Sequence, residues 1–215
     1  MRLDRSILLK TLNGGDKKEL MDDIEQCFKR LETDLGLMVA SLSNLEVAAP
    51  LRDPLRDRLK WIFGSDAAAT IDQVKNKIEQ MLKVIQRPIS LSLKWADSQG
   101  PNVYAHVYND VNPLIAGNLF IYLDERYKVK EENSLNNRYL TLVHEFSHLA
   151  AQTKDYRYDP NIFWDDAARN QGNLGKCIQP SQTLDYTTQQ AVQNADCYGF
   201  LMAATYARMP TCQFP

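Results

Sequence analysis

The sequence has little of several features that mark large classes of protein. Its 215 residues carry a formal net charge of −2, with three histidines and four cysteines. Because there is no excess of positive charge, nothing in the composition favours a nucleic acid or an anionic membrane as a partner. The first apolar run, Ile7 to Leu9, is too short for a signal peptide, and no later stretch approaches the roughly 20 residues of a membrane span. We therefore expect a soluble protein that is cytoplasmic or is secreted by a route that needs no signal peptide.

The cysteines also lack the pattern of a metal site. Cys27, Cys177, Cys197 and Cys212 are far apart in the sequence, whereas metal-binding cysteines usually come in closely spaced pairs. Since no secretion signal accompanies them, reduced structural thiols are the favoured interpretation, and one or two disulfides are the alternative.

The first part of the chain carries apolar residues at helical spacing. One stripe runs from Leu20 to Leu42 and a second from Ile71 to Ile85, with steps of three and four residues. A short helix is expected between them, opened by Pro54 and closed by Gly64. Such stripes usually form core, so we predict that residues 1–87 form a helical hairpin, with a partner-binding surface as the alternative.

After Pro88 the pattern becomes strand-like. Residues 89–95 alternate, residues 102–108 are rich in β-branched and aromatic side chains, and residues 118–123 form a compact apolar run. An amphipathic helix is predicted to follow from about Ser134 to Gln152. The sequence thus predicts an α+β fold in which the helical region, 1–87, and a region with a small mixed sheet, 88–215, form one compact unit.

Residues 144–148 read His-Glu-Phe-Ser-His, the HExxH pattern of zinc peptidases. Histidines four residues apart project side by side from a helix, so His144 and His148 can bind one tetrahedral metal ion. Glu145 is rotated by about 100° from His144, which leaves it beside the metal as a general base toward metal-bound water. The alternative is a surface helix with two incidental histidines. The remaining histidine, His106, is expected to be a packed or surface residue of a strand.

The third ligand can be narrowed by elimination. A zinc peptidase site needs three protein ligands and one open position. Downstream of His148 the chain has no histidine and no glutamate, which excludes the metzincin and the thermolysin-like patterns. Six aspartates remain, with cysteine as a weaker option: Asp155, Asp159, Asp165, Asp166, Asp185 and Asp196.

Asp155 is the natural choice among these aspartates. On an unbroken helix it would share the histidine face but stand about 10 Å further along, too far to reach the same ion. The helix must therefore end near Gln152 and the chain must fold back. The alternative is that Asp155 is a solvated acid in a turn.

At this point the sequence resembles the aspzincins, a family that includes the deuterolysins and the peptidyl-Lys metalloendopeptidases. Its members follow HExxH with a Gly-Thr-x-Asp-x-x-Tyr-Gly segment. Residues 152–159 of this chain read Gln-Thr-Lys-Asp-Tyr-Arg-Tyr-Asp, so three positions match and both flanking glycines are replaced, which leaves the loop conformation open. The resemblance implies a zincin-like catalytic domain with one catalytic Zn²⁺ held by His144, His148 and Asp155. It also implies that Tyr158 is a catalytic residue.

Tyr158 would donate a hydrogen bond to the oxyanion, a kind of contact whose loss typically costs on the order of 100-fold in rate. A packed loop aromatic is its alternative role, and Tyr156 is the alternative donor.

In zincin peptidases a sheet edge before the active-site helix binds the extended substrate by strand addition. The run from residue 118 to 123 is the candidate edge, which makes Asn118, Phe120 and Tyr122 predicted substrate contacts. A central strand is the alternative for this run.

A second match to the family begins at Asn194, where the chain reads Asn-Ala-Asp-Cys-Tyr-Gly-Phe. In lysine-specific members this aspartate and an acid three residues later bind the substrate lysine. Asp196 keeps the first position, and Gly199 replaces the later acid. The resemblance therefore implies that Asp196 binds substrate, with a hydrogen-bonded internal helix acid as the equal alternative. It extends over about residues 118–206, and Gly199 stops the prediction short of lysine specificity.

The predicted function is a zinc-dependent endopeptidase that acts on proteins or peptides. One alternative is a zinc-bearing module that binds or inhibits without turnover, against which Glu145 and Tyr158 argue. The other is a helical interaction protein without metal. Because an unrestrained endopeptidase endangers its own cytosol, we lean toward an exported effector or toxin. An inhibitor or immunity partner would suit such a protein, and the oligomeric state is left open.

Overall fold

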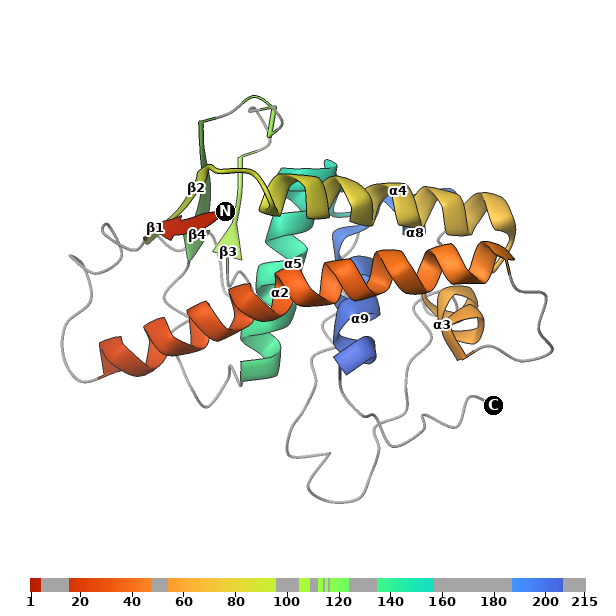
Figure 1. Cartoon of the computed structure of the whole chain (residues 1–215), viewed down its shortest axis with the longest axis horizontal. Helices are drawn as coiled ribbons and strands as arrows, with labels where there is room; N and C mark the ends of the chain where they lie inside the picture. The colour runs from red at the N-terminus through yellow and green to blue at the C-terminus, as the bar shows by residue number, and fades with distance from the viewer. Residues whose placement is uncertain are drawn as a thin grey trace, which may run out of the picture.

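Figure 1 shows the computed structural model of the chain, which describes residues 1–4, 16–47, 54–95, 105–108, 112–113, 115, 117–123, 135–156 and 187–206. The helices are α2 (Asp16–Val47), α3 (Pro54–Phe63), α4 (Ala68–Ile85), α5 (Leu135–Ala151), α8 (Thr188–Gln193) and α9 (Ala195–Tyr206). The strands are β1 (Arg2–Asp4), β2 (Ser90–Trp95), β3 (Ala105–His106) and β4 (Asn118–Leu123). The protein is thus an α+β fold with a small mixed sheet.

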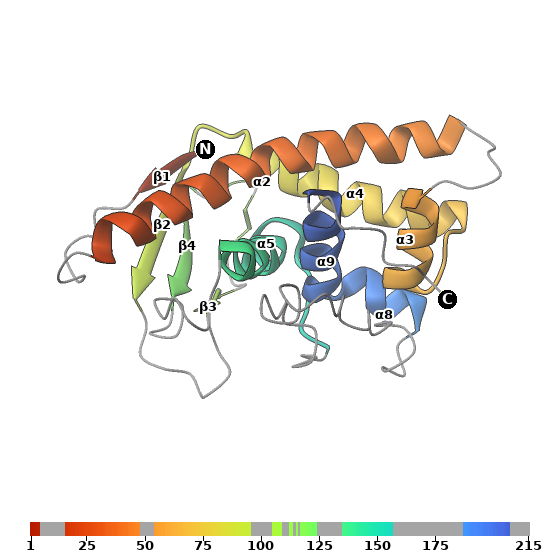
Figure 2. The same cartoon turned by 90° about the horizontal axis from the view of Figure 1, so that it is seen from below.

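The two N-terminal apolar stripes become the buried faces of α2 and α4. Leu31 and Leu35 of α2, and Val74 and Ile78 of α4, are completely buried. The two helices run alongside each other in opposite directions, and both pack against α5 (Figures 1 and 2). Their side chains belong to the same hydrophobic core as those of the sheet and of α5, so the division predicted at residue 87 does not separate two cores.

The strand order in the sheet is β1-β2-β4-β3. Strand β2 is parallel to both β1 and β4, whereas β3 is antiparallel to β4. Strand β4 is therefore not the last strand of the order, and the prediction that residues 118–123 form a sheet edge is wrong at Tyr122 and Leu123, where β3 pairs with β4. Among the described residues, β3 does not extend along the rest of β4. Strand β1 is three residues long, and no pattern in the sequence predicted it.

Side chains alternate across β4. Leu119, Ile121 and Leu123 are buried in the core, while Phe120 and Tyr122 point to the other face of the sheet and are half-buried. There the Lys94 ammonium lies 3.9 Å from the centre of the Phe120 ring. The predicted substrate contacts of β4 thus lie on the sheet face opposite the helices.

Helix α5 lies at the centre of the fold, in contact with α2, α4, α9, β3 and β4. Its first half is fixed to α2 by polar contacts. The Tyr139 hydroxyl donates a hydrogen bond to Asp34, and both residues have no exposed surface. Arg30 bridges the pair, with its Nε 3.4 Å from Asp34 and its guanidinium 4.0 Å from the centre of the Tyr139 ring. These contacts hold the first half of α5 against α2, just before the segment that carries the two histidines.

Candidate metal centre

The second half of α5 and the loop after it bring three candidate ligands together. The helix ends at Ala151, and Gln152 has a φ of 53°, the left-handed conformation that commonly ends helices. The Gln152 N–H donates to the His148 carbonyl at 3.1 Å, and the ammonium of Lys77 on α4 donates to the Ala151 carbonyl. The prediction that the helix ends near Gln152 and the chain folds back is confirmed.

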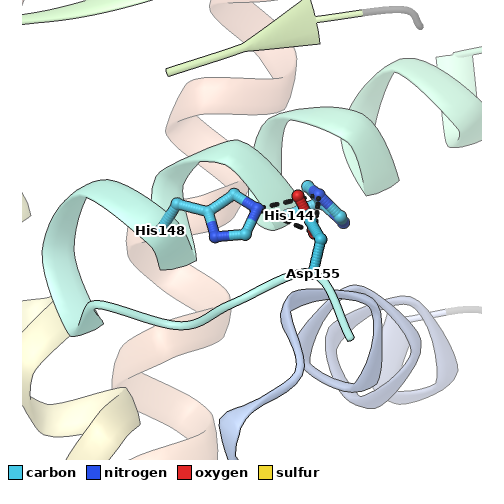
Figure 3. A group of neighbouring side chains, drawn as sticks. All are labelled: His144, His148 and Asp155. Carbon is cyan, nitrogen blue, oxygen red and sulfur yellow. Dashed lines mark hydrogen bonds and ion pairs between the residues drawn. The ribbon is translucent and has the colours of Figure 1, made fainter. Parts of the chain in front are cut away.

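The reversal carries Asp155 back to the two histidines of α5 (Figure 3). Its Oδ1 lies 3.1 Å from His144 Nε2 and 3.0 Å from His148 Nε2, and the two Nε2 atoms are 3.0 Å apart. The three atoms form a nearly equilateral triangle. The structure therefore brings together His144, His148 and Asp155, which the sequence proposed as one ligand set.

The triangle fits zinc. Zinc binds imidazole nitrogen and carboxylate oxygen at about 2.0–2.2 Å with tetrahedral geometry, which separates neighbouring ligand atoms by roughly 3.3 Å. Edges of 3.0 to 3.1 Å need only a slight opening to reach that value. Two nitrogens and one carboxylate oxygen are also a ligand combination that zinc peptidases use, with the fourth position open.

The other nitrogen of each imidazole is hydrogen-bonded within the protein. His148 Nδ1 lies 2.9 Å from the Thr153 carbonyl oxygen, and because a carbonyl can only accept, Nδ1 carries the proton. His144 Nδ1 lies 2.6 Å from Asp196 Oδ1 in the same way. Protonation at Nδ1 leaves both Nε2 lone pairs for a metal, and such contacts typically fix ligand orientation and increase ligand basicity.

The contact of Asp196 with His144 is a feature that sequence reasoning missed. We expected a substrate-binding carboxylate or an internal helix acid, and the structure places Asp196 against a candidate zinc ligand. The two residues are 52 positions apart in sequence, so no spacing rule connects them. The available signal was chemical, because histidine ligands commonly donate their second N–H to a carboxylate.

The neighbouring carboxylates stabilise the protonated form of His144, so a metal ion that binds Nε2 has to displace a proton from it. Burial alone would lower the pKa of His144, but hydrogen bonds to Asp155 and Asp196 raise this pKa well above its usual value. Burial would raise the pKa of Asp155, but hydrogen bonds with both histidines hold it well below its usual range. The site therefore favours an ionised Asp155, the form in which a carboxylate binds metal.

Glu145 lies beside the triangle. Its Oε1 is 3.9 Å from His144 Nε2, and the residue is 5% exposed. Burial raises the pKa of its carboxyl, although the neighbouring histidines oppose the change. Tyr158, the other predicted catalytic residue, lies outside the described residues.

Asn194 separates the last two helices that the structure describes. Helix α8 ends at Gln193 and α9 begins at Ala195, because Asn194 between them has extended backbone angles, φ −89° and ψ 128°. The break turns α9 so that its first turn carries Asp196 to His144, while Gly199 lies against Leu140 of α5. The position of Asp196 therefore depends on the break at Asn194, which we call the corner between α8 and α9.

A buried helix whose two histidines meet an aspartate from the following loop is the kind of centre that defines a zinc peptidase. A family model described as lysine-specific metallo-endopeptidase matches residues 52–203. Since the match spans more than half of the chain, the protein belongs to the aspzincin family of zinc metalloendopeptidases. The match begins well before residue 118, so the resemblance is longer than the sequence motifs indicated, and it includes α3 and α4.

A solved structure supports the same fold. The zinc peptidase from Grifola frondosa aligns with a TM-score of 0.54 at 18% sequence identity, over 91% of this chain and 99% of that chain. At this identity the likeness concerns the fold alone. A search of curated proteins found no match.

Proposed function

We propose that His144, His148 and Asp155 hold the single catalytic zinc ion and that Glu145 is the general base in the hydrolysis of peptide bonds. The observation that carries this proposal is the triangle of ligand atoms, 3.0 to 3.1 Å on each side. Zinc, when bound, supplies Lewis-acid chemistry that makes water a better nucleophile and polarises a substrate carbonyl. The substrates are proteins or peptides, in keeping with the family.

Glu145 is suited to carry a proton through the reaction. The base must take a proton from the attacking water and later deliver it to the leaving amine. A carboxyl group whose pKa is raised by burial is a stronger base than an ordinary glutamate, so it accepts this proton more readily. Its Oε1 lies 3.9 Å from His144 Nε2, beside the proposed ligand atoms, which supports this role.

Asp196 orients His144 rather than serving only the substrate. The 2.6 Å contact with Nδ1 holds the ring so that Nε2 faces Asp155.

Tyr158 is proposed as the oxyanion donor on the strength of the resemblance. Tyr158→Phe should lower kcat by on the order of 100-fold with little change in KM, since the contact forms in the transition state; an unchanged kcat would remove Tyr158 from the mechanism.

We infer that the enzyme does not require lysine. Gly199 supplies no carboxylate where lysine-specific members have one, and a Cβ built there would lie 3.6 Å from the Leu140 side chain and carbonyl, against α5. The carboxylate of Asp196 is engaged with His144. Digestion of a proteome, followed by mass spectrometry of the termini, should show cuts before several residue types, whereas more than nine in ten cuts before lysine would refute this inference.

Metal analysis and a single variant test the central proposal. The purified protein should contain one zinc per chain, and a chelator should abolish cleavage that added zinc restores. Glu145→Gln should keep the zinc and lose cleavage, since the amide has the shape of the acid without its basicity. A wild-type protein that binds zinc but cleaves nothing in the proteome digestion would instead indicate the non-catalytic module.

The cellular location stays a prediction. Across the described part of the chain, no helix is both long and apolar enough to cross a bilayer. Export as an effector or toxin rests on the hazard that such an enzyme poses to its own cytosol. The prediction of export is tested by looking for the intact protein in culture medium, with a cytosolic marker as the lysis control. Retention of the protein inside the cell would count against export.

A further inference from the structure

The loop that carries Asp155 lies against the corner between α8 and α9. The Lys154 N–H donates to the Gln193 carbonyl at 2.7 Å, and the Ala195 N–H donates to the Lys154 carbonyl at 3.1 Å. These two bonds form an isolated parallel bridge between Lys154 and Asn194. They fix the backbone on the N-terminal side of Asp155.

On the C-terminal side the contact comes from a side chain. The Tyr156 N–H donates to Asn194 Oδ1 at 3.2 Å. Asn194 is 2% exposed, and its Nδ2 donates to Cys197 Sγ at 3.7 Å, which sets the orientation of the amide. Asp155 is therefore bracketed, with backbone bonds before it and the Asn194 carbonyl oxygen after it.

We infer that Asn194 is a positioning residue for the third zinc ligand, an inference that rests on the proposed metal site. Its Oδ1 holds the backbone just after Asp155, so that Asp155 Oδ1 stays within 3.1 Å of both Nε2 atoms. The Asp155 side chain is 31% exposed, so it lies at the surface of the site. A ligand on an exposed loop must be ordered before binding, and a buried acceptor that orders it lowers the entropic cost of capturing the metal.

The corner itself explains why an asparagine fits this position. An extended backbone at Asn194 interrupts the helix and directs its side chain along the ligand loop. The side chain needs an acceptor for Tyr156 and a donor for Cys197, and a carboxamide has both. Without the Asn194 carboxamide the Tyr156 N–H would lose its acceptor, so the loop and the corner are coupled through this contact.

Two variants of nearly equal size separate the positioning role from packing. Asn194→Leu and Asn194→Asp both lose the donor to Cys197, but the aspartate keeps an acceptor for the Tyr156 N–H. The zinc dissociation constant, measured by competition with a chromophoric chelator, should rise by about 10- to 100-fold in the leucine variant, the usual effect of losing a contact that supports a ligand. In the aspartate variant it should stay within about threefold of wild type.

A further pair of variants approaches the contact from the loop. Tyr156→Pro removes the donor and leaves the sequences of α8 and α9 unchanged, so it should weaken zinc binding by about tenfold or more even if Asn194→Leu fails to fold. Because proline also restricts the backbone of Asp155, this variant tests the inference through the opposite result, an affinity that stays at the wild-type value. Tyr156→Ala keeps the N–H and removes a side chain that is largely exposed, and its zinc affinity should match wild type. Circular dichroism of each variant reports whether it is folded.

The outcomes distinguish this inference from the proposed function. A wild-type protein without stoichiometric zinc would refute the metal site and the inference with it. Stoichiometric zinc in the wild type, together with wild-type affinity in folded Asn194→Leu or in Tyr156→Pro, would overturn the positioning role alone. Equal losses in the leucine and aspartate variants would also overturn it, because the acceptor would then make no difference.

Discussion

Replacing Gln152 by glycine should stabilise the protein. Gln152 is the one non-glycine residue with positive φ in the described part of the chain, at 53°, and it stands where the family motif has glycine. The left-handed conformation costs an ordinary residue roughly 1–2 kcal/mol. Glycine avoids this strain but gains about 0.4–1 kcal/mol of entropy in the unfolded chain. The difference predicts a net stabilisation of ~0.5–1 kcal/mol, because the exposed side chain of Gln152 contributes little packing.

Urea unfolding of Gln152→Gly and Gln152→Ala checks this reasoning. Alanine keeps the left-handed strain, so its free energy of unfolding should stay within about 0.3 kcal/mol of wild type. For a chain of this length the glycine variant should melt about 1–4 °C higher. Catalysis should be unchanged, since the loop already has the required turn. A glycine variant less stable than the alanine variant would show that Gln152 is not strained.

Three further predictions concern the framework around the site. Tyr139→Phe should cost about 1.5–3 kcal/mol of unfolding free energy, because the buried Asp34 carboxylate loses a hydrogen bond; a loss below about 0.5 kcal/mol in urea unfolding would contradict this. Gly36→Ala should stabilise by ~0.5–1 kcal/mol, since α2 continues through this position and a Cβ there meets no atom within 4 Å; a lower melting temperature would reveal a hidden clash. Burial raises the pKa of Cys27 and Cys197 from 9.0 to about 12, so both thiols are protonated at pH 8. Iodoacetamide should then label neither of these two until urea is added, and rapid labelling at Cys27 or Cys197 in the folded protein, located by peptide mass spectrometry, would refute their burial.

The parts of the site that the sequence revealed are those encoded over short distances. The spacing of His144 and His148 fixes their common face, whatever the rest of the chain does. The end of α5 was deducible because Asp155 cannot reach the histidines on a continuous helix. Both conclusions depend on about a dozen consecutive residues and on helix geometry, and the structure shows the same reversal at Gln152.

The parts that the sequence did not reveal depend on pairing between distant segments. Whether residues 118–123 are an edge or a central strand is decided by β3, which contributes two residues to the sheet. The contact between Asp196 and His144 needs α9 to pack on α5, and that packing follows from the helix break at Asn194. No local pattern encodes these pairings, because side chains that alternate in a strand look the same at either position in a sheet.

Helix α2 belongs with the catalytic unit even though the family match begins at residue 52. Its Leu31, Leu35 and Leu42 have no exposed surface, and burial of each contributes about 1.5–3 kcal/mol. Together these contributions approach the 5–15 kcal/mol that typically separates a folded domain from its unfolded chain. Asp34 of the same helix accepts the hydrogen bond of Tyr139 on α5, five residues before His144, the first candidate ligand. Because α5 carries two of the candidate ligands, the energy that orders α2 against it also preorganises the candidate metal site, and residues 88–215 alone lack this support.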